Sequence, residues 1–166
     1  MSLRIVSAAL VALSLTRSGV ASAQSTPRSV RAVRPAPAST PVLDVLHRIE
    51  GRLRATRYTH VTHVDEAAGR YDFDCSGMAA WVLARAAPHA HAAVMHYNGR
   101  GRPVASNYHD VIAAAPVDHA RAGWLRVAHA SELRPGDVIA WRRPPAVASR
   151  NTGHVLFVVG APRRLD

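Results

Sequence analysis

Apolar residues recur every three or four positions in the first half of the chain, which is the spacing of one face of an α-helix. The first such helix is expected to begin after Thr40, a residue type that caps helix N-termini, with Pro41 in its first turn. Its apolar face consists of Val42, Leu43, Val45, Leu46, Ile49 and Leu53. A second helix is expected over residues 74–87, ending at Pro88, and a third, short helix over residues 107–115.

The last third of the chain changes to short runs of β-branched and aromatic residues, the pattern of β-strands. The strand candidates are residues 124–127, 138–141 and 153–159. Pro135 and Gly136 predict a turn before the second strand, because proline presets one backbone dihedral and glycine accepts a positive one. Residues 56–72 lack a clear period and are expected to form a loop or an irregular strand. Residues 89–103 carry turn signals and histidines, and they are expected to form turns and solvated loop.

Helices that precede strands predict an α+β domain. The 166 residues are enough for one domain, and a hydrophobic content of 48% excludes a wholly disordered chain. Lys and Arg together number 21 against 11 Asp and Glu, for a net charge of +10, which favours anionic envelope polymers as partners. Nucleic acid is not expected, because the sequence has no helix-turn-helix, zinc or aromatic-basic motif. We expect a monomer without a transmembrane segment.

The N-terminal residues have the organisation of a secretory signal peptide. A basic start at Arg4 is followed by an apolar stretch over residues 5–15 and by the cleavage pattern Ala21-Ser22-Ala23. Residues 1–23 are therefore expected to be removed on export to the periplasm or the exterior, although an ordinary N-terminal helix is the alternative. Residues 24–40 are rich in Pro, Ser and Ala and are expected to form a linker, which leaves residues 41–166 as the folded domain.

A single cysteine, Cys75, stands near the start of the second predicted helix, which excludes an intrachain disulfide and a Cys-pair zinc site. The free N–H groups and the dipole of a helix N-terminus favour the thiolate, the nucleophilic form of cysteine. The alternative is a small buried hydrophobe without chemistry. A nucleophilic cysteine needs a base, and of the ten histidines only His154 opens a predicted buried strand, where a rigid element can aim it.

Three short blocks resemble, in family order, the hallmark motifs of the NlpC-type cell-wall cysteine peptidases. They are Asp74-Cys75-Ser76-Gly77, Leu133-Arg134-Pro135-Gly136-Asp137-Val138-Ile139 and Gly153-His154-Val155. The similar region extends from about residue 42 to the end of the chain. The resemblance implies a permuted papain-like core, in which N-terminal helices include a nucleophile helix packed on a small antiparallel sheet. It also implies a hydrolase that cleaves peptide bonds in bacterial peptidoglycan stems, with Cys75 as nucleophile, His154 as general base and no cofactor.

The same resemblance implies that a tyrosine upstream of the cysteine helps to bind the oxyanion. Tyr58 is the candidate, with Tyr71 as its rival. The aromatic-Gly-Gly element that usually follows this tyrosine is absent, so the bond that is cut stays open. The family's third polar residue follows the histidine on a strand, whereas Asp166 is the last residue here. We therefore expect a fragment that lacks its orienting group, with Asp166 as a poorly held substitute.

Other interpretations remain open at this point. His60, His63, Asp65 and Glu66 offer donors for a metal, but their spacing is loose for zinc, so no metal is expected and a place along the substrate cleft is favoured. An acyltransferase would use the same Cys75–His154 dyad and pass the acyl group to an amine or a lipid. A wall-binding module with the same fold and little or no activity is the non-enzymatic alternative.

Overall fold

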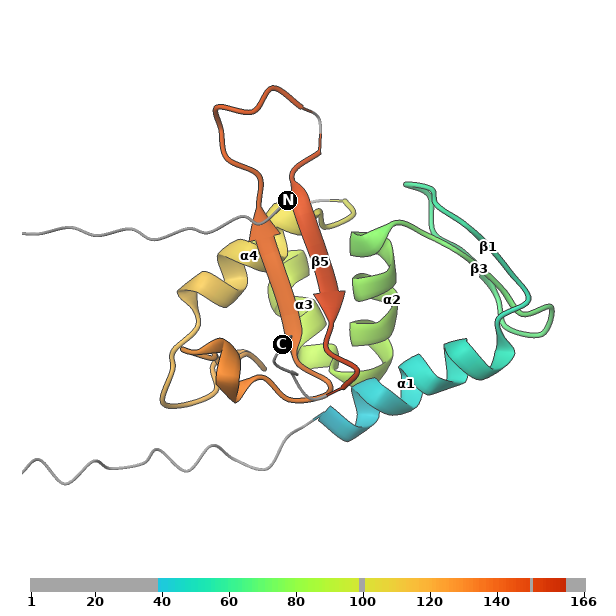
Figure 1. Cartoon of the computed structure of the whole chain (residues 1–166), viewed down its shortest axis with the longest axis horizontal. Helices are drawn as coiled ribbons and strands as arrows, with labels where there is room; N and C mark the ends of the chain where they lie inside the picture. The colour runs from blue at the N-terminus through green and yellow to red at the C-terminus, as the bar shows by residue number, and fades with distance from the viewer. Residues whose placement is uncertain (1–38, 99–100, 150, 161–166) are drawn as a thin grey trace, which may run out of the picture. The chain divides into compact units, whose positions relative to one another are not determined.

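The structure, a computed structural model, describes residues 39–98, 101–149 and 151–160 (Figure 1). The predicted signal peptide, nearly all of the predicted linker and Asp166 lie outside the described residues. The described residues form an α+β fold of four α-helices, one short 3-10 helix and two small sheets, which confirms the predicted fold class. The order along the chain differs from the prediction, because three strands lie between the first and second helices.

The first two helices agree closely with the sequence pattern. Helix α1 (Ser39–Arg52) buries most of the predicted apolar face, with Val42, Val45, Leu46 and Ile49 in the core, whereas Leu53 lies beyond the end of the helix and is 41% exposed. Helix α2 (Cys75–Ala86) is the central helix, and it packs against both α1 and the last strand. Its residues Ala79, Val82 and Leu83 are buried, so α2 joins the two halves of the hydrophobic core.

Helix α3 (Pro88–Asn98) corrects the prediction of turns and solvated loop for this region. Pro88 ends α2 but also occupies the first position of α3, where its fixed φ suits a helix start. Ala90 and Val94 are one turn apart and face the core, where Val94 is fully buried. Because histidines and alanines surround these two residues, the apolar face is too narrow to give a clear helical period in the sequence. Helix α4 (Ala105–Ala114) confirms the third predicted helix and begins two residues earlier than expected.

Residues 56–72 contain a small sheet where a loop or irregular strand was expected. Strands β1 (Ala55–Arg57), β2 (His63–Asp65) and β3 (Arg70–Asp72) have three residues each, which is too few to show a period in the sequence. Strand β3 lies in the middle, parallel to β1 and antiparallel to β2. This sheet extends from the end of α1 and leads directly into α2 (Figure 1).

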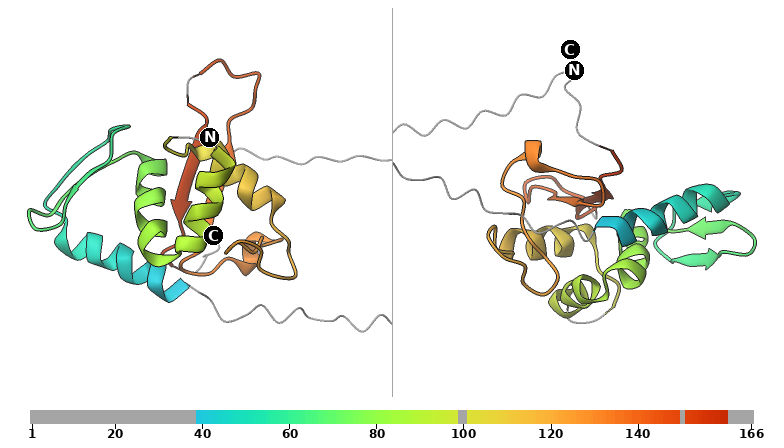
Figure 2. Two further views of the ribbon diagram at one scale, coloured as in Figure 1. Left: turned by 180° about the vertical axis from the view of Figure 1, so that it is seen from behind. Right: turned by 90° about the horizontal axis from the view of Figure 1, so that it is seen from below.

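The second sheet is an antiparallel pair formed by β4 (Val138–Arg142) and β5 (Gly153–Phe157), as the sequence predicts. Viewed from below, this pair lies on one side of a layer formed by α2, α3 and α4 (Figure 2). Helix α2 contacts β5, and α4 contacts both strands. The expectation of a cysteine-bearing helix packed on a small antiparallel sheet therefore holds for these elements.

Residues 124–127 do not form the predicted strand. The Trp124 and Arg121 backbones instead close a tight turn with two mutual hydrogen bonds of 2.8 and 2.9 Å. The buried Trp124 indole donates a hydrogen bond of 2.9 Å to the carbonyl of Ala90 on α3. A tryptophan that fixes a loop cannot be distinguished in the sequence from a tryptophan in a strand. Here the hydrogen bond to Ala90 on α3 fixes Trp124 in a loop. The 3-10 helix (Ala130–Glu132) follows and leads to β4.

Candidate functional site

Cys75 is the first residue of α2, and its position is fixed by the residue before it. Asp74 has extended backbone angles (φ −93°, ψ −178°), and its side chain accepts a hydrogen bond of 2.7 Å from the Gly77 N–H. This is the geometry of an N-cap, for which aspartate is among the preferred residues. The Cys75 side chain is partly exposed, so the thiol is accessible beside the free N–H groups of the first helical turn.

One cavity brings together the three residues singled out from the sequence. Cys75, Tyr58 and His154 all line a cavity of about 530 Å³ between α1, α2, β1 and β5. Helix α2 and strand β5 run side by side, and their first residues lie at the same end (Figure 1). Cys75 begins α2 and His154 is the second residue of β5, so both residues line the cavity from the end at which these two elements start.

Tyr58 follows β1 and reaches the cysteine from outside the core. Its side chain is 70% exposed, and like Cys75 it lines the cavity. Partial burial, followed by the negative charges of Cys75 and Asp74, raises the pKa of the Tyr58 hydroxyl above its ordinary value. The hydroxyl therefore stays protonated at neutral pH and can donate a hydrogen bond into the cavity.

Tyr71, the rival of Tyr58, lies elsewhere. It is 1% exposed in the middle of β3, with its ring edge-on to Trp81 at 5.9 Å between centroids. Its buried hydroxyl has no hydrogen-bond partner within the described part of the chain, and Tyr71 does not line the cavity at Cys75. Tyr71 is therefore a core residue, and of the two tyrosines only Tyr58 reaches the cysteine.

His154 is held by the β4–β5 pair. It lies opposite Trp141 in the strand register, and the two rings are 5.0 Å apart between centroids. The preceding residue, Gly153, has a φ of +137°, and a side chain there would collide with the Trp141 carbonyl. Over residues 39–98, 101–149 and 151–160, no side chain hydrogen-bonds the His154 ring. The position of the His154 ring is thus fixed by packing against Trp141.

Asn151 has a turn function next to this histidine. Its side-chain oxygen accepts a hydrogen bond of 2.9 Å from the Gly153 N–H.

The structure shows an ion-pair network beside Cys75 that the sequence did not predict. Arg102 reaches both carboxylate oxygens of Asp74, at 2.5 and 2.8 Å, and also donates to the Ser76 hydroxyl at 3.0 Å. His60 adds a contact of 2.7 Å between its Nδ1 and the same carboxylate. Burial by itself would raise the pKa of Asp74, but the hydrogen bonds from Arg102, His60 and the Gly77 N–H hold this pKa well below its usual range. Asp74 is therefore a buried carboxylate that stays charged at neutral pH and holds the turn before Cys75.

The four side chains considered as metal donors have separate partners or are exposed in the structure. His60 pairs with Asp74, whereas His63 and Asp65 are exposed in β2, and Glu66 contacts Arg52 and Arg85. Across the described ranges, no group of three or more His, Cys, Asp or Glu side chains is arranged to hold a metal ion.

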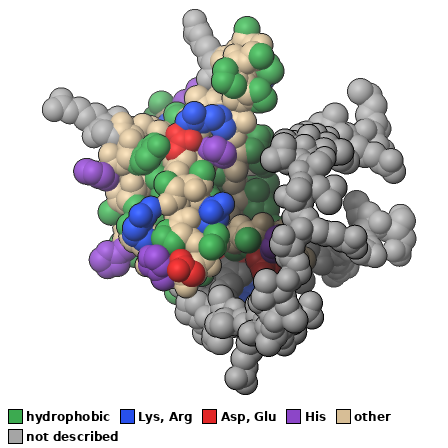
Figure 3. Space-filling view, turned by 90° about the vertical axis from the view of Figure 1, so that its left-hand side faces the viewer, with side chains coloured by type: hydrophobic (Ala, Val, Ile, Leu, Met, Phe, Trp, Pro, Cys, Tyr) green, Lys and Arg blue, Asp and Glu red, His purple; other side chains and the backbone are tan. Residues whose placement is uncertain are grey.

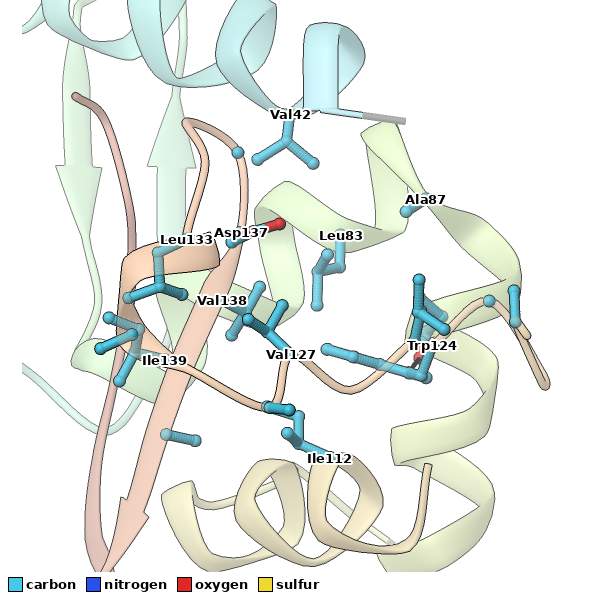
Figure 4. Close-up of a pocket in the computed structure, with 18 of the residues that line it drawn as sticks. Val42, Leu83, Ala87, Ile112, Trp124, Val127, Leu133, Asp137, Val138 and Ile139 are labelled. Atoms are coloured by element: carbon cyan, nitrogen blue, oxygen red, sulfur yellow. Dashed lines mark hydrogen bonds between the residues drawn. The ribbon is translucent and has the colours of Figure 1, made fainter. Parts of the chain in front are cut away.

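The Pro-Gly-Asp block lies away from the cysteine. Gly136, at φ +92°, donates to the Val158 carbonyl at 2.7 Å, and Val158 donates back to the Asp137 carbonyl at 2.8 Å. These two hydrogen bonds join the turn to Val158, the residue that follows β5. It also lines a second cavity of about 600 Å³, where Leu83, Val127 and Trp124 converge from α2 and the 120–140 segment (Figure 4). This second cavity is mostly apolar and lacks a nucleophile.

The charged groups of the described surface are mixed in sign where Figure 3 shows them. Arginine, acidic and histidine side chains alternate with apolar ones on this face, so the net positive charge does not form a continuous block there (Figure 3). Opposite charges also pair directly: Asp110 contacts both Arg142 and His109. Among the described helices, none combines the length and the apolar character that a membrane span requires.

Comparison of the chain with protein-family models, with curated proteins and with solved structures found no match. The chemistry of the Cys75 cavity is the remaining guide to function. It combines a thiol at a helix N-terminus, an imidazole and a phenolic hydroxyl. These are the groups that attack a carbonyl, transfer a proton and stabilise an oxyanion in acyl-transfer reactions.

Proposed function

We propose that the protein is an exported thiol hydrolase that cleaves an amide bond in bacterial peptidoglycan stem peptides. The observation that carries the proposal is the convergence of Cys75, His154 and Tyr58 on one cavity, although they are far apart in the sequence. The ordered resemblance to the NlpC-type peptidases supports the cell-wall substrate and a permuted papain-like arrangement of the fold. The net positive charge supports attraction to anionic envelope polymers.

The proposed reaction proceeds through a thioester. His154 accepts the thiol proton, and the Cys75 sulfur attacks the carbonyl carbon of the amide bond. The Cys75 N–H and the Tyr58 hydroxyl donate hydrogen bonds to the oxyanion. His154 then returns the proton to the leaving nitrogen as the C–N bond breaks. In the second half, His154 takes a proton from water, hydroxide attacks the thioester, and the carboxylic acid and the free thiol are released.

The acyl-enzyme is the most direct target for an experiment. Incubation with p-nitrophenyl acetate should add one acetyl group to Cys75, seen by mass spectrometry, with a burst of p-nitrophenol. Cys75→Ala should abolish the adduct, and His154→Ala should slow its formation by about 10²-fold or more. His47→Ala is the matched control, because His47 is exposed on α1 and does not line the cavity.

The cell-wall part of the proposal needs its own substrate. Purified peptidoglycan and soluble stem peptides should release new amino termini with the native chain and none with Cys75→Ala. If esters acylate Cys75 but stem peptides stay intact, the peptidase assignment is wrong. Added amines or lipid acceptors that capture the acyl group would favour an acyltransferase. Binding to cell walls without any acylation of Cys75 would favour an inactive wall-binding module.

A further inference from the structure

The cavity beside Cys75 is lined mainly by apolar side chains. Leu46 and Val155 are buried core residues that form part of its lining. Two lining residues near Cys75 in the sequence are also apolar: Phe73 precedes the N-cap Asp74, and Met78 lies one turn after Cys75 on the same face of α2. Phe157 continues the apolar lining along β5. An acyl group attached to Cys75 would therefore meet hydrocarbon.

Charged groups are nearly absent from this lining. Among the described residues, Asp74 is the only acidic residue of the lining, and that carboxylate is already engaged by Arg102, His60 and the Gly77 N–H. No arginine in the described part of the chain lines the cavity. A carboxylate or ammonium group placed against the apolar part of this lining, formed by Leu46, Val155 and Phe157, would lose water there without gaining an oppositely charged partner, which is unfavourable. The volume of about 530 Å³ lies in the ordinary range of small-molecule sites, about 300–1,000 Å³.

We infer that the group attached to the scissile carbonyl is uncharged and apolar, such as an aliphatic or aromatic side chain or a short acyl chain. This inference rests on the proposed thiol hydrolase function and adds the substrate class on the acyl side. The acyl part stays bound to the sulfur through the thioester, so it is the part of the substrate that occupies this lining longest. The leaving group departs toward His154, which supplies its proton and borders the exposed Trp141.

Three p-nitrophenyl esters test the inference on the native chain: acetate, hexanoate, and the ester of monoanionic adipate. Hexanoate and adipate present acyl chains of the same length that differ by a terminal carboxylate. We expect the kcat/KM for Cys75 acylation by hexanoate to exceed the values for acetate and for adipate by about tenfold or more. Rates with free glutathione correct for the intrinsic reactivity of each ester, and Cys75→Ala gives the background.

The outcomes separate the inference from the function on which it rests. Acylation of Cys75 by all three esters at equal rates, or fastest by adipate, would overturn the apolar acyl site while leaving the thiol hydrolase proposal intact. Failure of every ester to acylate Cys75 would overturn both.

Two variants provide an independent readout. Met78→Lys places a cation in the cavity and should shift the hexanoate-to-adipate ratio toward adipate by about tenfold, whereas Met78→Leu should preserve the native ratio. An unchanged ratio in a folded Met78→Lys protein would contradict the inference. Circular dichroism of both variants establishes that each is folded.

Discussion

The guanidinium of Arg102 donates hydrogen bonds to both carboxylate oxygens of Asp74, the residue immediately before the cysteine, with nitrogen–oxygen distances of 2.5 and 2.8 Å. Asp74 is 4% exposed, so its charge is compensated inside the protein and not by water. The same carboxylate caps α2 through Gly77. Arg102 therefore acts on Cys75 indirectly, by holding the turn from which α2 starts, and it is a positioning residue.

Removal of Arg102 should destabilise the fold. Arg102→Ala leaves the buried Asp74 carboxylate with fewer partners, and the free energy of unfolding should fall by about 1–3 kcal/mol. Urea denaturation measures the change. Arg48→Ala is the matched control, because Arg48 is an exposed helical arginine on α1, and its effect should stay below about 0.5 kcal/mol. Equal effects of the two variants would show that the Asp74–Arg102 pair has no structural importance.

Stability should also depend on Asp74 in acid. The pKa of Asp74 is lowered in the folded protein, so its carboxylate contributes stability above its unfolded pKa of 3.8. That contribution is lost as the pH falls from 3.8 toward the lower folded pKa, because the unfolded chain takes up the proton first. The free energy of unfolding should therefore fall in this window, and less steeply in Asp74→Asn, which can still cap α2. Identical slopes for the two proteins would contradict the assignment.

Gly153 should resist substitution because of its backbone. At φ +137°, a side chain is strained and would collide with the Trp141 carbonyl on the paired strand. Gly153→Ala should lower the free energy of unfolding by about 1–3 kcal/mol and displace His154, which reduces Cys75 acylation. Gly160→Ala is the control, since a Cβ there meets no atom within 4 Å. A fully stable and active Gly153→Ala protein would contradict this account of how His154 is held.

Tyr58 should affect the reaction without affecting the fold. Because the side chain is 70% exposed, Tyr58→Phe removes a hydroxyl at little structural cost. Loss of one oxyanion donor should lower kcat/KM for ester hydrolysis by about 10²-fold. Tyr97→Phe, at a half-exposed tyrosine on α3, should leave kcat/KM unchanged. If the two variants behave alike, the Tyr58 hydroxyl has no role in the reaction.

The sequence predicted the elements whose signals are local. Helix α2 was predicted because residues at helical spacing form one face and Pro88 ends the run; the Asp74 N-cap is added by the structure. Strand β4 was predicted because a β-branched run follows the Pro135-Gly136 turn, and β5 because of its own run of β-branched and aromatic residues. Cys75 and His154 were singled out for the same reason, since each stands at the start of such an element. Their convergence on one cavity is a tertiary property that the structure adds.

The features that the sequence did not predict depend on long-range contacts. Helix α3 is stabilised by packing of Ala90 and Val94, not by a wide apolar face. Trp124 is placed by a hydrogen bond to Ala90, 34 residues earlier. Arg102 stands in a glycine-rich segment that resembles an ordinary turn, and only the fold brings it to Asp74, 28 residues before it. No local pattern distinguishes such a residue from the other arginines of this chain.

The rate of Cys75 alkylation by iodoacetamide at pH 7 tests the central claim most directly. If the imidazole of His154 activates the thiol, the native chain should react about tenfold faster than free glutathione. His154→Ala should bring the rate down to that of glutathione, and His47→Ala should leave it unchanged. A native rate equal to that of glutathione, with no effect of His154→Ala, would contradict a Cys75–His154 nucleophile.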